Sequence, residues 1–332
     1  MITFWQQAGN NLIELNKQDL DLEKKTWIDV RSVTREDIKV LEDVYHVLEE
    51  HILDILDQDE MSRIEPDDEY TLFIFRLPIY NPENDVPYLT IPLGIVLFPD
   101  KIITICWTDC EVLKDITSNR IKNISIENFA SFILKIMSRT DISFLRYLKE
   151  INRRTITIQG ELQMSVKNNE LIQLFNLEKS LEYFTTSLKS NQLFIEKLYK
   201  TKRLPLDEDQ RDFLDDIAID NRQAIEMTDI YSNILSGMMD AFASVISNNL
   251  NIVMKRLTVV SLVLNVPTLI VSFFGMNIKL PFANSGWIGT LCVSTICLVG
   301  TCLASLILKD KPVKEPRKKK KKRKNRKSDE KK

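Results

Sequence analysis

The pattern of hydrophobic and polar residues changes twice along the chain. In the first 140 residues, short runs rich in Ile, Leu, Val and aromatic side chains predict strands at 26–30, 70–79, 88–98 and 101–107. Between the first two runs, Thr34 and Asp37 have the spacing of a capping box, which predicts that a helix begins there. Strands alternating with helices predict an α/β domain over residues 1–140.

Residues 141–256 follow a helical pattern instead. In one stretch, apolar residues recur at alternating spacings of three and four, which is typical of the seam between paired antiparallel helices. The residues of this seam are Leu174, Leu177, Leu181, Phe184 and Leu188. Farther along, no proline occurs between Pro205 and Pro267, so a single stalk helix can run from about residue 207 into the next segment, over about 100 Å.

Two uncharged apolar segments follow, 257–274 and 286–308, with 18 and 23 residues. Both are long enough to cross a hydrocarbon core of about 30 Å, and they are too long for ordinary buried core helices. They predict two transmembrane helices within residues 257–308, joined by an external loop at 278–285. The predicted fold is therefore an α+β membrane protein with a cytoplasmic α/β domain, long stalk helices and two transmembrane helices.

Residues 309–332 form a basic tail with fifteen Lys or Arg against four Asp or Glu. By the positive-inside rule this tail predicts a cytoplasmic C-terminus, and two crossings place the N-terminus there as well. The opening residues lack the pattern of a signal peptide, which favours the plasma (inner) membrane. The basic run 317–324 is either a topology signal in a solvated tail or a segment that binds anionic lipids or tunes ion flow. We expect membrane lipids, and no nucleic acid, as partners of the protein as a whole.

Five polar residues in the first transmembrane segment recur three and four positions apart, so they share one side of the helix. They are Thr258, Ser261, Asn265, Thr268 and Ser272. Such a stripe can hydrogen-bond packed helices together or, in several copies, line a water-filled lumen. The amide of Asn265 favours the lumen, which requires an oligomer with the second segment as an outer ring.

The sequence carries no recognisable enzyme motif. Its eight glycines are scattered, no Walker-type phosphate loop occurs, and His46 and His51 lack a metalloprotease pattern. Cys106 and Cys110 have no second pair to complete a zinc site. We therefore expect neither catalysis nor nucleotide binding.

Directly after the first transmembrane segment stands the tripeptide Gly275, Met276 and Asn277. A ring of asparagine carbonyls at a pore mouth suits a hard cation that keeps its water, as Mg²⁺ does. In this position the tripeptide resembles the signature of the CorA family of magnesium channels, and the resemblance extends over nearly the whole chain. It implies a homopentamer whose first transmembrane helices line the pore.

The resemblance also implies roles for single residues. Gly275, Met276 and Asn277 correspond to the external selectivity filter. Met254, with Leu257 next to it, corresponds to a hydrophobic constriction, and Asp240 to an acidic residue facing the axis in the stalk. Other pore-facing positions of the family fall at Asn251, Thr258, Asn265 and Thr268, in agreement with the polar stripe.

A regulatory metal site is implied in the same way. It bridges neighbouring subunits through an aspartate of the α/β domain and one of the stalk helix, which resemble Asp54 and Asp216. Asp57, Asp215 and Asp220 are nearby alternatives. We expect Mg²⁺ bound there to hold the channel closed, and repulsion between the two carboxylates to open it when internal Mg²⁺ falls.

The predicted function is passive, channel-type influx of divalent cations, with Mg²⁺ as both cargo and regulator. The alternatives are a transporter of Co²⁺, Ni²⁺, Zn²⁺ or Mn²⁺ with the same fold, and a membrane-anchored sensor or scaffold that conducts nothing. Two departures from the family bear on ion preference. The loop 278–285 has no carboxylate and contains Lys279, and Ser272 replaces an expected glycine.

Overall fold

The computed structural model describes residues 1–122, 124–164, 168–276 and 286–308. The chain divides into two compact units, Met1–Ala243 and Ser244–Lys332. The first unit holds a seven-stranded sheet with its covering helices, and the second holds the two apolar helical segments. The domain boundaries at 140 and 256 stay predictions; both fall inside long helices.

The sheet has the strand order β2-β1-β3-β7-β6-β5-β4. Only the β3–β7 pair is parallel among the pairings described, and the other neighbours are antiparallel. The four predicted strands are confirmed as β3 (Thr26–Arg31), β5 (Thr71–Tyr80), β6 (Tyr88–Leu97) and β7 (Lys101–Cys106). Three further strands complete the sheet: β1 (Ile2–Ala8), β2 (Asn11–Leu15) and β4 (Arg63–Pro66).

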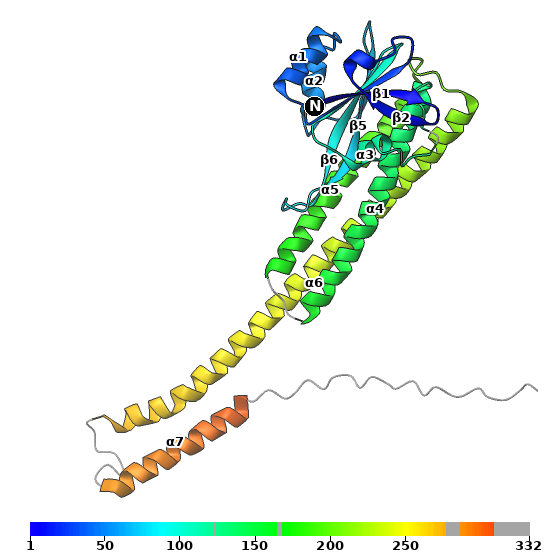
Figure 1. Ribbon diagram of the computed structural model, residues 1–332. Coiled ribbons are helices and arrows are strands. Elements are labelled where there is room, and N and C mark those ends of the chain that lie inside the picture. Colours follow the sequence, from blue (N-terminus) through cyan, green and yellow to red (C-terminus); the bar gives the residue numbers. More distant parts are fainter. Residues whose placement is uncertain (123, 165–167, 277–285, 309–332) are drawn as a thin grey trace, which may run out of the picture. The chain divides into compact units, whose positions relative to one another are not determined.

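The two faces of the sheet carry separate hydrophobic cores, because successive side chains of a strand point to opposite faces. Leu72 and Ile74 of β5 belong to the core under α1 (Arg35–Asp43) and α2 (Glu49–Leu56). Phe73 and Phe75 of the same strand belong to the other core, which includes residues of α3 (Glu111–Thr117), α4 (Phe129–Met164), α5 (Asn168–Leu198) and α6 (Glu208–Phe274). Figure 1 shows α2 and α3 on either side of the strands.

Local sequence explains how α1 and α2 are held. The predicted capping box is present: Thr34 accepts from the Asp37 amide, and the Asp37 carboxylate accepts from the Thr34 amide. Gly94 of β6 lets α2 approach the sheet, since a Cβ at this glycine would lie 2.3 Å from Ile55 Cδ1. Ile55 is fully buried, so any side chain at position 94 would push α2 outward.

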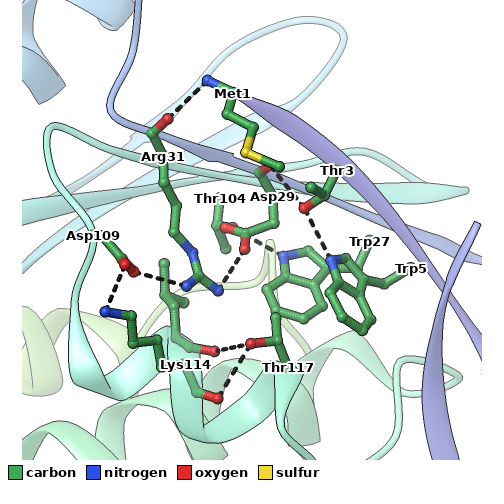
Figure 2. A network of polar contacts seen from close by, with 11 residues as sticks. Met1, Thr3, Trp5, Trp27, Asp29, Arg31, Thr104, Asp109, Lys114 and Thr117 are labelled. Atoms are coloured by element: carbon green, nitrogen blue, oxygen red, sulfur yellow. Dashed lines mark hydrogen bonds and ion pairs between the residues drawn. The ribbon is translucent and has the colours of Figure 1, made fainter.

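A buried ion pair ties β3 to the loop that precedes α3. Asp29 forms an ion pair with Arg31 (2.6 Å) and accepts a hydrogen bond from the hydroxyl of Thr104 (2.8 Å), while Arg31 also donates to Asp109 (3.0 Å) (Figure 2). Burial raises the pKa of the Asp29 carboxyl, and Arg31 opposes that shift. Lys114 closes the chain of charges by pairing with Asp109 at 2.6 Å.

The long helices α4 and α5 lie side by side below the sheet (Figure 1). The predicted apolar seam on α5 is confirmed, because all five of its residues are buried in a core shared with α4 and α6. The predicted stalk helix is also confirmed as α6, which runs without interruption for 67 residues.

Candidate functional site

The second unit contains two helical segments that are long and apolar enough to cross a membrane: the C-terminal part of α6 and α7 (Gly286–Leu308). They contact each other along one side of α6. Val266 and Ile270 approach Gly300 of α7, where an added Cβ would lie 3.2 Å from Val266 Cγ1 and 3.5 Å from Ile270 Cδ1. The Sγ of Cys297 also reaches the carbonyl of Pro267, at 4.0 Å. Small residues on α7 thus allow a close helix pair.

The polar stripe lies on the other side of α6. Val259, Val263, Val266 and Ile270 are half-buried and mark the side that faces α7, whereas Thr258, Ser261, Asn265, Thr268 and Ser272 are all exposed. With about 100° between successive residues, the centre of the stripe lies roughly 180° from the centre of the α7-facing side. The helix pair therefore leaves its polar residues pointing away from the hairpin.

Two hydroxyls of the stripe are satisfied within their own helix. Thr258 donates to the carbonyl of Met254 at 2.8 Å, and Thr268 donates to that of Leu264 at 3.0 Å. The threonine oxygens keep their lone pairs for an acceptor role, which is the role a hydrated cation needs. Asn251, Met254 and Leu257 are exposed and lie within about 70° of the stripe centre, so the predicted constriction shares the same side.

The signature tripeptide begins where α6 ends. The helix closes at Phe274, the Gly275 amide donates to the carbonyl of Val271 at 2.9 Å, and Met276 is exposed. Asn277, the predicted filter asparagine, lies outside the described residues, as do the loop 278–285 and the tail 309–332.

Asp54, the first predicted metal ligand, lies in the last turn of α2 and forms an ion pair with Arg63 of β4, at 2.6 Å. The same guanidinium binds two more carboxylates: its Nε lies 2.9 Å from Glu65, and its Nη1 donates to Glu60. The hydrogen bond from Arg63 lowers the pKa of Glu65. This cluster was not predicted from the sequence.

Asp216, the second predicted ligand, is exposed on α6. Two of the alternative aspartates, Asp215 and Asp220, interact with other groups of the same chain. Asp215 accepts a hydrogen bond from the phenol of Tyr199, whose pKa is raised by burial and by that carboxylate. The negative charge of Asp220 adds to burial in raising the pKa of Asp141 of α4. Asp240, the predicted acidic stalk residue, is also exposed on α6.

Asp54 and Asp216 belong to opposite faces of the sheet. The neighbours of Asp54 on α2, Ile52 and Ile55, are buried in one core. The neighbours of Asp216, Leu214 and Ile217, are buried in the other. The sheet lies between the two carboxylates, so one chain does not bring them together. Among the described residues of a single chain, no group of three His, Cys, Asp or Glu is arranged to hold a metal ion.

Comparison with known proteins agrees with this architecture. A family model described as CorA-like Mg²⁺ transporter protein matches residues 23–309. A curated relative, the cobalt/magnesium transport protein CorA of Methanocaldococcus jannaschii, is 29% identical over 236 residues, which are 69% of this chain and 73% of that protein. The magnesium transport protein CorA of Helicobacter pylori is 27% identical over 135 residues, 40% of this chain and 42% of its own length.

Solved structures show the same fold. The complete structure of the CorA magnesium transporter from Methanocaldococcus jannaschii matches with a TM-score of 0.75 and 23% identity, covering 92% of this chain and 96% of that one. The full-length CmaX protein matches with a TM-score of 0.65 and 14% identity, over 93% and 97% of the two chains. With the family model spanning most of its length, the chain belongs to the CorA-like Mg²⁺ transporter protein family.

Proposed function

We propose that this protein is the subunit of a homopentameric channel that admits divalent cations, Mg²⁺ above all. The observation that carries the proposal is the polar stripe on α6, which lies opposite the side that contacts α7. In a ring of hairpins, this geometry puts α7 outside and the stripe around a central lumen, where exposed amide and hydroxyl oxygens meet water.

The filter is assigned to the end of α6. Five copies of Gly275, Met276 and Asn277 surround the external mouth, and the Asn277 carbonyls select a cation that keeps its hydration shell. Met254 and Leu257 narrow the lumen at the other end of the stripe, and Asp240 supplies negative charge where the ion leaves toward the stalk. The relatives named as magnesium or cobalt/magnesium transport proteins support this assignment.

Ion entry needs no nucleotide. An inside-negative membrane potential contributes about 2.3 kcal/mol per charge per 100 mV, so about 4.6 kcal/mol for a divalent cation. The basic tail supports a plasma-membrane protein with both termini in the cytoplasm, so this potential drives Mg²⁺ inward.

Regulation is assigned to Asp54 and Asp216 of adjacent subunits. Carboxylate oxygens are the ligands that Mg²⁺ prefers, and each of these residues reaches solvent on its own face of the domain. Because the sheet separates the two faces, a metal ion that binds both residues links two subunits. Bound Mg²⁺ holds the ring symmetric and the constriction closed.

Influx into proteoliposomes tests the proposal. Purified protein is reconstituted with an internal Mg²⁺ dye and an inside-negative potential, and Asn277→Ala is compared with Asn284→Ala, the same change elsewhere in the loop. We expect the influx through Asn277→Ala to be lower by about tenfold or more, because the loss of one carbonyl ligand from every subunit removes the whole filter ring. Asn284→Ala keeps the influx.

Two outcomes would contradict the proposal. Undiminished influx through Asn277→Ala would remove the filter assignment. No influx of Mg²⁺, Co²⁺, Ni²⁺, Zn²⁺ or Mn²⁺ through the unmodified protein would leave a membrane-anchored sensor or scaffold. Cobalt is the favoured second cargo, because the Methanocaldococcus jannaschii relative is a cobalt/magnesium transport protein.

A further inference from the structure

Arg63 holds three carboxylates with three different nitrogens. Its Nη2 binds Asp54, its Nε binds Glu65 and its Nη1 binds Glu60, so the cluster of four side chains carries two more negative than positive charges. Such a cluster attracts a further cation. The Asp54 side chain is 35% exposed, so an ion from solvent can reach it.

The guanidinium and a metal ion would compete for the same oxygens. Mg²⁺ demands close contact with its carboxylate oxygens, and Asp54 Oδ2 already accepts from Arg63 at 2.6 Å. A metal ion that takes this oxygen must displace Nη2. The Arg63 guanidinium would still be paired after that exchange, because Nη1 keeps its contact with Glu60 and Nε keeps its contact with Glu65.

We propose that Arg63 is a tethered competitor that sets the internal Mg²⁺ concentration at which the channel closes. This inference rests on the proposed regulatory role of Asp54. The arginine pairs with Asp54 when Mg²⁺ is scarce and moves onto Glu60 and Glu65 when Mg²⁺ binds. The competition raises the Mg²⁺ concentration needed for closure.

The test measures influx into proteoliposomes preloaded with a series of Mg²⁺ concentrations, which gives the half-inhibiting concentration. We expect Arg63→Gln to lower it about two- to tenfold, since an ion pair of this exposure no longer opposes the metal. Arg63→Lys keeps the charge but cannot hold three carboxylates at once, so its value falls between those of Arg63→Gln and the unmodified protein. Arg35→Gln, the same change at an exposed site outside the cluster, leaves the value unchanged.

The outcomes distinguish a failure of the Arg63 competition from a failure of the proposed regulatory role of Asp54. A half-inhibiting concentration that Arg63→Gln leaves unchanged or raises would overturn the competition. A value for Arg63→Lys equal to that of the unmodified protein would also overturn it, because charge alone would then explain the effect. Asp54→Asn should relieve inhibition and abolish any further effect of Arg63→Gln; inhibition that survives Asp54→Asn would refute the regulatory site itself.

Discussion

At the scale of single residues, the stalk buries a carboxylate that the proposed transport does not use. Asp141 of α4 is 3% exposed and lies close enough to Asp220 of α6 to be affected by its charge. Burial, and then the negative charge of Asp220, raise the pKa of Asp141 well above its ordinary value. The folded protein therefore binds a proton at Asp141 more tightly than the unfolded chain does. The stability that this bound proton contributes is lost as pH rises through the raised pKa.

Asp141→Asn should consequently stabilise the protein at neutral pH. At pH 7 the folded protein must either bury the charge of Asp141 or hold a proton that the unfolded chain has lost. The neutral amide avoids both costs, which we expect to raise the free energy of unfolding by about 1–3 kcal/mol at pH 7. Near pH 4 the carboxyl is protonated in the folded state and the gain should disappear. Thermal unfolding of detergent-purified protein across this pH range measures the difference. An equal effect at both pH values would show that Asp141 acts through packing alone.

At the scale of elements, α2 depends on the missing side chain of Gly94. We expect Gly94→Ala to destabilise the first unit by about 1–3 kcal/mol, because the new methyl group overlaps Ile55 and forces α2 from the sheet. Gly160→Ala on α4 is the matched control, since its added Cβ meets nothing within 4 Å. That change should stabilise by roughly 0.5–1 kcal/mol. Chemical denaturation followed by tryptophan fluorescence compares them, and equal stabilities of Gly94→Ala and the unmodified protein would show that α2 adjusts freely.

How much of the molecule the sequence predicts depends on how each element is buried. The strands β5, β6 and β7 are apolar on both faces, so their runs are visible without a structure. By contrast, β2 is largely exposed and β4 contains Arg63 and Glu65, so neither has such a run. The polar stripe follows from helical spacing alone. The separation of Asp54 from Asp216 does not, because it depends on which face of the sheet each helix covers.

At the scale of the whole molecule, the opposite placement of these two aspartates links regulation to assembly. One chain presents Asp54 through α2 on one face of its sheet and Asp216 through α6 on the other. A ring in which the first face of each subunit meets the second face of the next would join every Asp54 to a neighbouring Asp216. The same arrangement is head-to-tail, and such contacts close into a ring when the rotation between neighbouring subunits divides a full turn evenly.

The double variant Asp54→Cys and Asp216→Cys tests this arrangement directly. We expect copper-phenanthroline oxidation or a short bismaleimide to give a ladder of linked species on a gel run without reducing agent, because each link joins two chains. The ladder should end at five subunits, the number in the proposed ring. Each single variant should remain monomeric on the gel, since Cys106 and Cys110 are buried within the domain. The remaining three cysteines, Cys292, Cys297 and Cys302, are changed to alanine in all samples. A link confined to one chain would mean that the sheet does not keep the two aspartates apart, and a ladder that stops at a dimer would exclude the closed ring.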